Sequence, residues 1–279
     1  MKLAVLADIH ANLAALESVL ADIDTWQPDA VIVAGDIVNR GPQPRACLEL
    51  MLARARATGW RLLLGNHEEY VLYQAEPTTP RHGPEAELYR SSYWTYRQLD
   101  ELMPVLTALP FAQSLTAPDG SHARAAHSSM RSTRDGIFTV TPDAVVREQI
   151  GSPAPALFVV GHTHLPLIRR VDKTLVVNVG AVGVPFDGDP RASYGRMTWT
   201  RRGWQARIVR LPYDLARTLR DYRETGFLAE GGPLTRLMQV ELEQARSQLF
   251  TFANLYQSAV LAGEISMEDA VARFLASGL

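Results

Sequence analysis

The sequence predicts an α/β protein that ends in a helical extension. Three observations lead to this class. In the first 64 residues, short apolar runs alternate with helical patterns, which is typical of parallel strands joined by helical crossovers. The second half again contains apolar runs of strand length, and after Pro212 only helical patterns remain. We therefore expect a main domain at residues 1–212 and a helical extension at residues 213–279 that packs on it.

The first half of the chain is expected to contain three strands, three helices and a hairpin. Short runs of Val, Leu and Ile predict strands at residues 3–7, 30–34 and 61–64. Apolar residues at helical spacing follow Asn12, which is a suitable N-cap. Further helical patterns lie at residues 44–57 and 85–103, and the turn residues 118–120 predict a hairpin of strands at 111–116 and 122–127.

The second half is expected to contain a helix, two single strands, another hairpin and the helical extension. The helix is predicted at residues 142–150 and the single strands at residues 157–160 and 175–179. Strands at 193–200 and 204–211 are joined by a short turn and form the hairpin. In the extension, helices are predicted at residues 214–224, 233–262 and 266–276, the last of them capped by Ser266.

Composition favours a globular protein of the cytoplasm. The formal net charge is only −2, which argues against a nucleic-acid coat or a binder of anionic membranes. No apolar stretch approaches the roughly 20 residues that span a bilayer. The single cysteine, Cys47, excludes an intrachain disulfide framework and lies on the apolar side of a predicted helix, where we expect a core residue.

Polar residues stand at the ends of five predicted strands. In an open α/β sheet, ligands collect where the carboxyl ends of the strands meet, so these residues can converge on one site. Five of the seven histidines of the chain lie in these segments. The candidate residues are Asp8, His10, Asp36, Asn66, His67, His127, His162 and His164.

Imidazole and carboxylate groups without thiolates suit divalent transition metals. The spacing of Asp8 with His10, and of His162 with His164, places each pair on one side of an extended backbone. Asp36 can bridge two ions, and two ions about 3.5–4 Å apart would clamp a phosphoryl group and lower the pKa of a bridging water.

Each fragment taken alone has a simpler explanation. Asp8 and His10 could cap the following helix, and the Gly-Asp and Gly-Asn-His segments could be ordinary turns. His127 could be a core histidine with its hydrogen bonds satisfied. The occurrence of all the fragments, in this order and at strand ends, favours a metal site over these alternatives.

The fragments resemble the motifs of the calcineurin-like metallophosphoesterase superfamily. Its pattern is D-x-H, G-D, G-N-H-E, an isolated histidine and G-H-x-H, and all five blocks lie within residues 8–164. Residues 187–194 resemble a stretch of a bacterial subfamily of small phosphoesterases. The resemblance implies a four-layer α-β-β-α sandwich of two mixed sheets, and it leaves the C-terminal helices unexplained.

The resemblance also implies a role for each residue. One metal would be held by Asp8, His10, Asp36 and His164, and the other by Asp36, Asn66, His127 and His162. His67 would stabilise phosphoryl oxygens or protonate the leaving group, and Arg40 would bind phosphate. The cofactors would be two divalent transition ions, of which manganese is favoured over iron, zinc or nickel.

Three positions depart from the family pattern. Asn39 stands where protein phosphatases carry an aspartate that orients the histidine, so an acid role of His67 would be weaker. The block around His127 and the stretch at residues 178–181 also differ from the pattern. None of these changes removes a metal ligand.

The expected function is hydrolysis of a phosphodiester or nucleotide-type ester by attack of a metal-bridging hydroxide. A phosphomonoesterase or protein phosphatase, a diadenosine tetraphosphate hydrolase and a nuclease stay open, and a non-enzymatic binding scaffold is disfavoured because every ligand is present. The expected partner is a small phosphorylated or nucleotide substrate, without stable nucleic-acid or membrane binding.

Two further features concern aromatic residues. Tyr89, Tyr93, Trp94 and Tyr96 either pack in the core or cover the metal site and stack on a base. Aromatic residues of the C-terminal helices, Phe250 among them, could either pack within the chain or form a homodimer interface.

Overall fold

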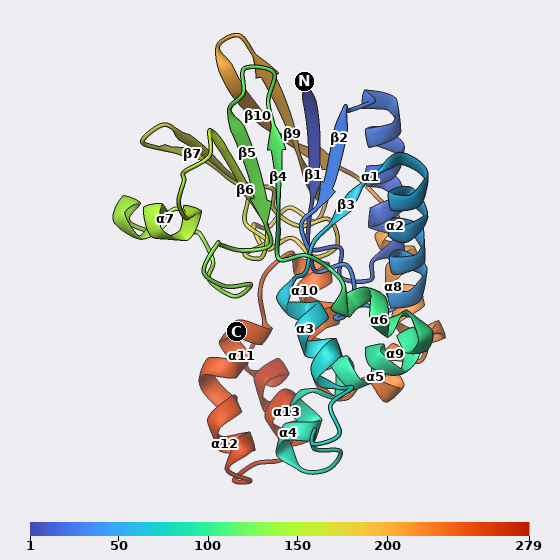
Figure 1. Ribbon diagram of the computed structural model, residues 1–279. Helices are drawn as coiled ribbons and strands as arrows, with labels where there is room; N and C mark the ends of the chain where they lie inside the picture. Colours follow the sequence, from blue (N-terminus) through green and yellow to red (C-terminus); the bar gives the residue numbers. More distant parts are fainter. Residues whose placement is uncertain (279) are drawn as a thin grey trace.

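The computed structural model describes residues 1–278 and contains two mixed five-stranded sheets that face each other (Figure 1). The first sheet has the order β10-β9-β1-β2-β3, with bounds Gly203–Leu211, Ala192–Thr200, Lys2–Leu6, Ala30–Val33 and Arg61–Leu62. The second has the order β4-β5-β6-β8-β7, with bounds Ala112–Thr116, His122–Ala126, Leu157–Val160, Thr174–Asn178 and Leu167–Val171. Strands β1 to β3 are parallel, and so are β5, β6 and β8.

Alternation along the central strands divides the core into layers. Leu3 and Val5 of β1 face the second sheet, whereas Ala4 and Leu6 face the helices α1 (Leu13–Trp26) and α2 (Pro44–Thr58). In the second sheet, the outward residues of β6 pack on α7 (Asp143–Ile150). Because successive side chains of a strand point to opposite faces, apolar runs of this kind require cover on both sides. The expected α-β-β-α sandwich is confirmed.

A layer of helices lies at the carboxyl ends of the strands (Figure 1). Part of it connects the two sheets: α3 (Asn66–Tyr73), α4 (Pro84–Leu88), α5 (Arg90–Leu99) and α6 (Met103–Thr107), with a 3₁₀ turn at Asp100–Leu102. The rest follows β10: α8 (Leu215–Glu224), α9 (Phe227–Glu230), α10 (Leu234–Gln244), α11 (Leu249–Phe252), a π-helical turn (Ala253–Gln257), α12 (Ser258–Leu261) and α13 (Met267–Ser277). Trp94 of α5 packs on Phe227 of α9 within one core, so the extension is joined to the connecting helices.

Most elements lie where the sequence predicts them, including the two hairpins and the caps Asn12 and Ser266. Strand β7 is missing from the prediction, because it is an edge strand whose Arg169 and Arg170 hide the apolar pattern. The single helix expected at 233–262 is wrong: α10 ends before Ala245, which has a left-handed backbone (φ 50°).

The region expected to be helical at 85–103 consists of α4, α5 and the 3₁₀ turn. Cys47 is buried in α2, as expected. Across residues 1–278 we find no helix whose length and apolar character would allow it to cross a membrane. The domain boundary at residue 212 stays a prediction.

Candidate metal centre

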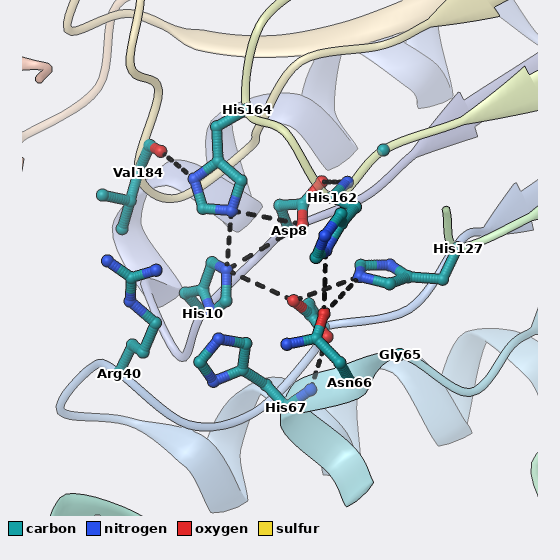
Figure 2. A network of polar contacts seen from close by, with 12 residues as sticks. Asp8, His10, Arg40, Gly65, Asn66, His67, His127, His162, His164 and Val184 are labelled. Atoms are coloured by element: carbon teal, nitrogen blue, oxygen red, sulfur yellow. Dashed lines mark hydrogen bonds and ion pairs between the residues drawn. The ribbon is translucent and has the colours of Figure 1, made fainter. Parts of the chain in front are cut away.

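The candidate residues come together at the carboxyl ends of both sheets (Figure 2). The loops after β1 and β2 carry Asp8, His10 and Asp36, and α3 begins with Asn66. The second sheet supplies the other three residues, His127 after β5 and His162 and His164 after β6. Because the sheets face each other, residues separated by more than 150 positions in the chain approach to hydrogen-bonding distance.

The side chains form two adjacent groups that share Asp36. In the first group, His10 Nε2 lies 3.1 Å from His164 Nε2, and His164 Nε2 lies 3.3 Å from Asp8 Oδ1. Asp36 Oδ2 stands between the groups, 3.6 Å from His10 Nε2 and 3.3 Å from His127 Nε2.

The second group is completed by Asn66. Its Oδ1 lies 2.9 Å from both His127 Nε2 and His162 Nδ1. The amide oxygen, the two imidazoles and the Asp36 carboxylate therefore surround one point, next to the point that the first group surrounds. This division agrees with the ligand sets implied by the resemblance.

The backbone at this centre is unusual. Five of the seven candidate ligands have left-handed backbones, with φ of 55° at Asp8, 47° at His10, 54° at Asp36, 69° at His162 and 58° at His164. Such conformations cost of order 1–3 kcal/mol per residue and persist only where the surroundings require them. The expected extended geometry is therefore wrong. Asp8 and His10 nevertheless fall in one group, whereas His162 and His164 fall in different groups.

Two glycines permit these loops to approach one another. A Cβ atom on Gly65 would collide with the carboxylate and backbone nitrogen of Asp36, and one on Gly161 would collide with the Asp8 carboxylate. Any larger residue would push the loops apart. The glycines of the motifs are thus required by packing against the ligands themselves.

The ionisation of the centre follows from burial and from Asp36. Burial lowers the pKa of His10 well below its usual value and that of His162 to about 4, so both imidazoles are neutral, the form that binds metals. Burial also opposes a charge on His127, but Asp36 raises the pKa of that imidazole to about 10. For Asp36, burial opposes ionisation, but the charge of His127 and its hydrogen bond to the carboxylate outweigh burial and lower the pKa well below its usual value.

The donor set fits two divalent ions. Asp8 Oδ1 is buried and has no hydrogen-bond partner within residues 1–278, which is costly for a carboxylate unless a cation is present. The Nδ1 atoms of His127 and His164 donate to the carbonyls of Ala34 and Val184, so each Nε2 is directed to the centre. Such second hydrogen bonds orient the histidine ligands of metal sites.

Glu68 is a structural partner of the centre to which the sequence analysis assigned no role. Its carboxylate is fully buried and accepts hydrogen bonds from the backbone N–H groups of Gly65, Asp36, Ile37 and Val38 at 2.7–3.1 Å. It thereby joins the loop after β2 to the start of α3. The signal was its place at the end of the G-N-H-E block.

His67 lies beside the ligands and contacts them through its ring and its backbone. The ring is edge-on to His10 at 4.8 Å between centroids, and its backbone N–H donates to Asp36 Oδ1 at 2.9 Å. The expected contact with Asn39 is present, since the Asn39 amide Nδ2 lies 3.0 Å from His67 Nδ1. Burial lowers the pKa of His67 to about 3, so the imidazole is neutral.

Arg40 lies on the His10 side of the centre (Figure 2), and its charge is paired with a carboxylate. Its guanidinium forms a buried ion pair with Glu241 of α10, and it lies 5.5 Å from the ring of Phe186, which stacks on His164. Glu241 was not anticipated, because it reads as one polar residue of an amphipathic helix. The C-terminal extension thus contributes directly to the surroundings of the centre.

The aromatic residues predicted to cover the site divide into two groups. Trp94 is buried in the core of the helical layer, and Tyr93 stacks on Tyr96. Tyr89 instead packs near Tyr70, which contacts the ring of His67. Only Tyr89 of the four therefore lies near the metal centre.

Two facing mixed sheets whose strand ends bring buried Asp and His side chains to a binuclear site define a protein of the metallophosphoesterase class. Residues 1–202 match the model of the calcineurin-like phosphoesterase superfamily domain, and the chain belongs to this superfamily.

Three relatives resemble the chain over most of its length. A metallophosphoesterase from Sphaerobacter thermophilus is 29% identical with a TM-score of 0.67, and the match covers 88% of this chain and 100% of that one. Hypothetical protein PH1004 from Pyrococcus horikoshii has the same fold, with a TM-score of 0.73, 17% identity and coverage of 88% and 99%. Uncharacterized protein MJ0912 from Methanocaldococcus jannaschii is 29% identical over 239 residues, which are 76% of this chain and 88% of the relative.

Proposed function

We propose that the chain is a two-metal-dependent phosphoesterase that hydrolyses a phosphodiester or nucleotide-type ester. The observation that carries this proposal is the convergence of side chains from both sheets on two adjacent points that share Asp36. Two divalent ions bound there would polarise a phosphoryl group and lower the pKa of a water molecule. The proposed ligands are Asp8, His10, Asp36, Asn66, His127, His162 and His164, whose nitrogen and oxygen donors suit manganese, iron, zinc or nickel.

His67 is proposed to donate a hydrogen bond to the phosphoryl or leaving-group oxygen. The Asn39 amide donates to its Nδ1, so the hydrogen of the neutral ring is carried on Nε2. A donor that is fixed before the reaction stabilises developing charge without reorganisation. Asn39 thus supports an oriented neutral donor rather than a charged acid.

The charge balance at Arg40 favours a diester over a monoester. A monoester carries about two negative charges at neutral pH and a diester carries about one, so a monoester gains more from an unpaired cation. The charge of Arg40 is offset by the buried carboxylate of Glu241. We therefore propose that Arg40 shapes the site and contributes less to phosphate affinity than an unpaired arginine would.

The test is an assay of manganese-loaded protein on bis-p-nitrophenyl phosphate, diadenosine tetraphosphate and p-nitrophenyl phosphate, together with elemental analysis. We expect about two ions per chain, as the two-metal arrangement requires. Cleavage of the diester or of the dinucleotide should exceed that of the monoester. Absence of stoichiometric metal would contradict the metal centre, and a preference for the monoester would overturn the charge argument.

A further inference from the structure

A cavity of about 230 Å³ lies beside the metal centre. The loop that carries Asn39 and Arg40 and the start of α3 with His67 form one wall of this cavity. The opposite wall is formed by the connecting helices and the C-terminal extension. Its apolar lining consists of Leu88, Leu234, Met238, Leu249, Phe252 and Ala253. We call this cavity the ester pocket.

A series of rings leads from the metal centre into the ester pocket. Between ring centroids, His10 lies 4.8 Å from His67, His67 lies 5.2 Å from Tyr70, and Tyr70 lies 5.8 Å from Tyr89. His67, Tyr70 and Tyr89 all line the pocket. These distances are within the range of favourable aromatic pairs, so a planar group in the pocket would have rings to pack against.

The single charge that lines the ester pocket is balanced by a carboxylate outside the lining. Arg40 is the only lysine or arginine in it, neither aspartate nor glutamate lines it within residues 1–278, and Glu241 pairs with Arg40 from behind the wall. A charged group would lose its hydration in this pocket without an opposite charge to replace it. The pocket is therefore suited to an uncharged group, to which Ser91 and Gln257 can offer hydrogen bonds.

The volume limits how much of a substrate can enter. Pockets for whole drug-sized ligands occupy roughly 300–1,000 Å³, and the ester pocket is smaller. It accommodates one organic group of a phosphate ester and leaves the remainder at the metal centre or outside. A mixture of aromatic, apolar and hydrogen-bonding contacts matches a nucleoside better than an alkyl chain, which makes no hydrogen bonds.

We propose that the ester pocket binds one uncharged, planar organic group of the nucleoside class, while the phosphoryl group lies at the metal centre. The proposal rests on the proposed function, because it takes the phosphoryl position from it. It assigns a role to the C-terminal extension, since Leu234, Met238, Leu249 and Phe252 come from α10 and α11.

The experiment measures the binding of inorganic phosphate, adenosine monophosphate, hexyl phosphate and phosphoglycolate to manganese-loaded protein by calorimetry. Base–aromatic contacts are worth roughly 5- to 150-fold in affinity, so adenosine monophosphate should bind at least about tenfold more tightly than phosphate. Ala253, which lines the pocket, is changed to tryptophan to fill it. Ala253→Trp should remove the advantage of the nucleotide and leave the affinity for phosphate unchanged.

The matched control is Ala262→Trp, which makes the same change at an exposed position beyond the end of α12. It should behave like the unaltered protein. Gln257→Trp, at a half-buried position of the lining, repeats the test if Ala253→Trp does not fold. Thermal unfolding of each variant identifies loss of folding.

The outcomes separate the two proposals. If phosphate does not bind and no ester is hydrolysed, the proposed function fails. If phosphate binds but adenosine monophosphate binds no more tightly, the proposed role of the ester pocket is wrong, while the proposed phosphoesterase activity is unaffected. If hexyl phosphate bound as tightly as adenosine monophosphate, the pocket would not require a planar group. If phosphoglycolate bound more tightly than adenosine monophosphate, the pocket would not require an uncharged group.

Discussion

The metal centre and the ester pocket lie side by side but are built in different ways. At the metal centre, strained loops hold buried polar side chains, and the neighbouring carboxylates leave no room for a side chain at Gly65 or Gly161. The ester pocket is lined largely by helices, including the π-helical turn, and its walls include apolar side chains of ordinary type. Helical apolar positions tolerate exchange for residues of similar volume, whereas ligand loops do not.

This difference separates the reaction from the choice of substrate. Changes at the metal centre should abolish the reaction with every ester, because all esters share the phosphoryl group. Changes in the ester pocket should alter the relative rates with different esters without abolishing hydrolysis. The four predictions below test this separation, beginning with the largest effect.

The largest effect is expected from Asp36→Asn. The carboxylate of Asp36 stands between the two groups of ligands, and an amide carries no charge with which to bridge two cations. We expect metal content to fall and activity to vanish with all substrates. Elemental analysis and a manganese titration measure the loss. Asp24→Asn, at an exposed carboxylate of α1 paired with Arg54, is the control and should keep both ions.

His67→Ala should separate the reaction from metal binding. The hydrogen bond to Asp36 Oδ1 comes from the backbone of His67 and survives the substitution. We therefore expect near-normal metal content, with turnover lowered about 10²-fold or more, as for the loss of one positioned donor. His82→Ala removes an exposed histidine and serves as the control. If His67→Ala released the metals, His67 would be a ligand rather than a donor to the substrate.

The clustering of Asp and His side chains at the candidate metal centre could be predicted from the sequence, because these residue types stand together at strand ends. Asp8, Asp36 and His164 stand out there even without coordinates. Their left-handed backbones could not be predicted, because the left-handed region is disfavoured locally and is imposed by the packing of loops from two sheets.

Arg40, His67 and Tyr89 of the ester pocket stand out in the sequence, but the residues that α10 and α11 contribute have no local signature and could not be predicted. Glu241 lies 201 positions from Arg40, and in the sequence it resembles any polar residue of a helix. Its second oxygen accepts hydrogen bonds from the N–H groups of Gln248 and Leu249. These bonds help to turn the chain after α10, where the sequence pattern predicts one continuous helix. Only the packing of the extension brings these groups together.

A smaller effect on substrate preference is expected from Glu241→Gln. The substitution keeps the size of the side chain and removes the charge that offsets Arg40. We expect a several-fold tighter binding of inorganic phosphate and a relative gain for p-nitrophenyl phosphate over the diester. Stability should fall, since loss of one partner of a buried ion pair costs about 3–5 kcal/mol. Kinetics with both substrates and thermal unfolding provide the measurements.

The control for this prediction is Glu243→Gln, two positions further along α10, where the glutamate is exposed. This substitution should change neither the relative activity on monoester and diester nor the unfolding temperature. If Glu241→Gln lowered the activity on both substrates equally and left phosphate affinity unchanged, Glu241 would stabilise the extension without tuning Arg40. The charge argument for a diester would then lose its support.

The smallest effect is expected from Tyr89→Ala, compared with Tyr93→Ala. Both residues belong to the segment of α4 and α5, in which Tyr89 lies at the turn between the helices and Tyr93 within α5. Tyr89 lines the ester pocket near Tyr70, whereas Tyr93 stacks on Tyr96 and lies under the Arg81 guanidinium. One lost aromatic contact should reduce the affinity for adenosine monophosphate about fivefold to tenfold, at the lower end of base stacking. Phosphate affinity should not change. Equal losses in the two variants would show that the segment acts by packing alone, and the ester would then have to be selected by the wall of α10 and α11.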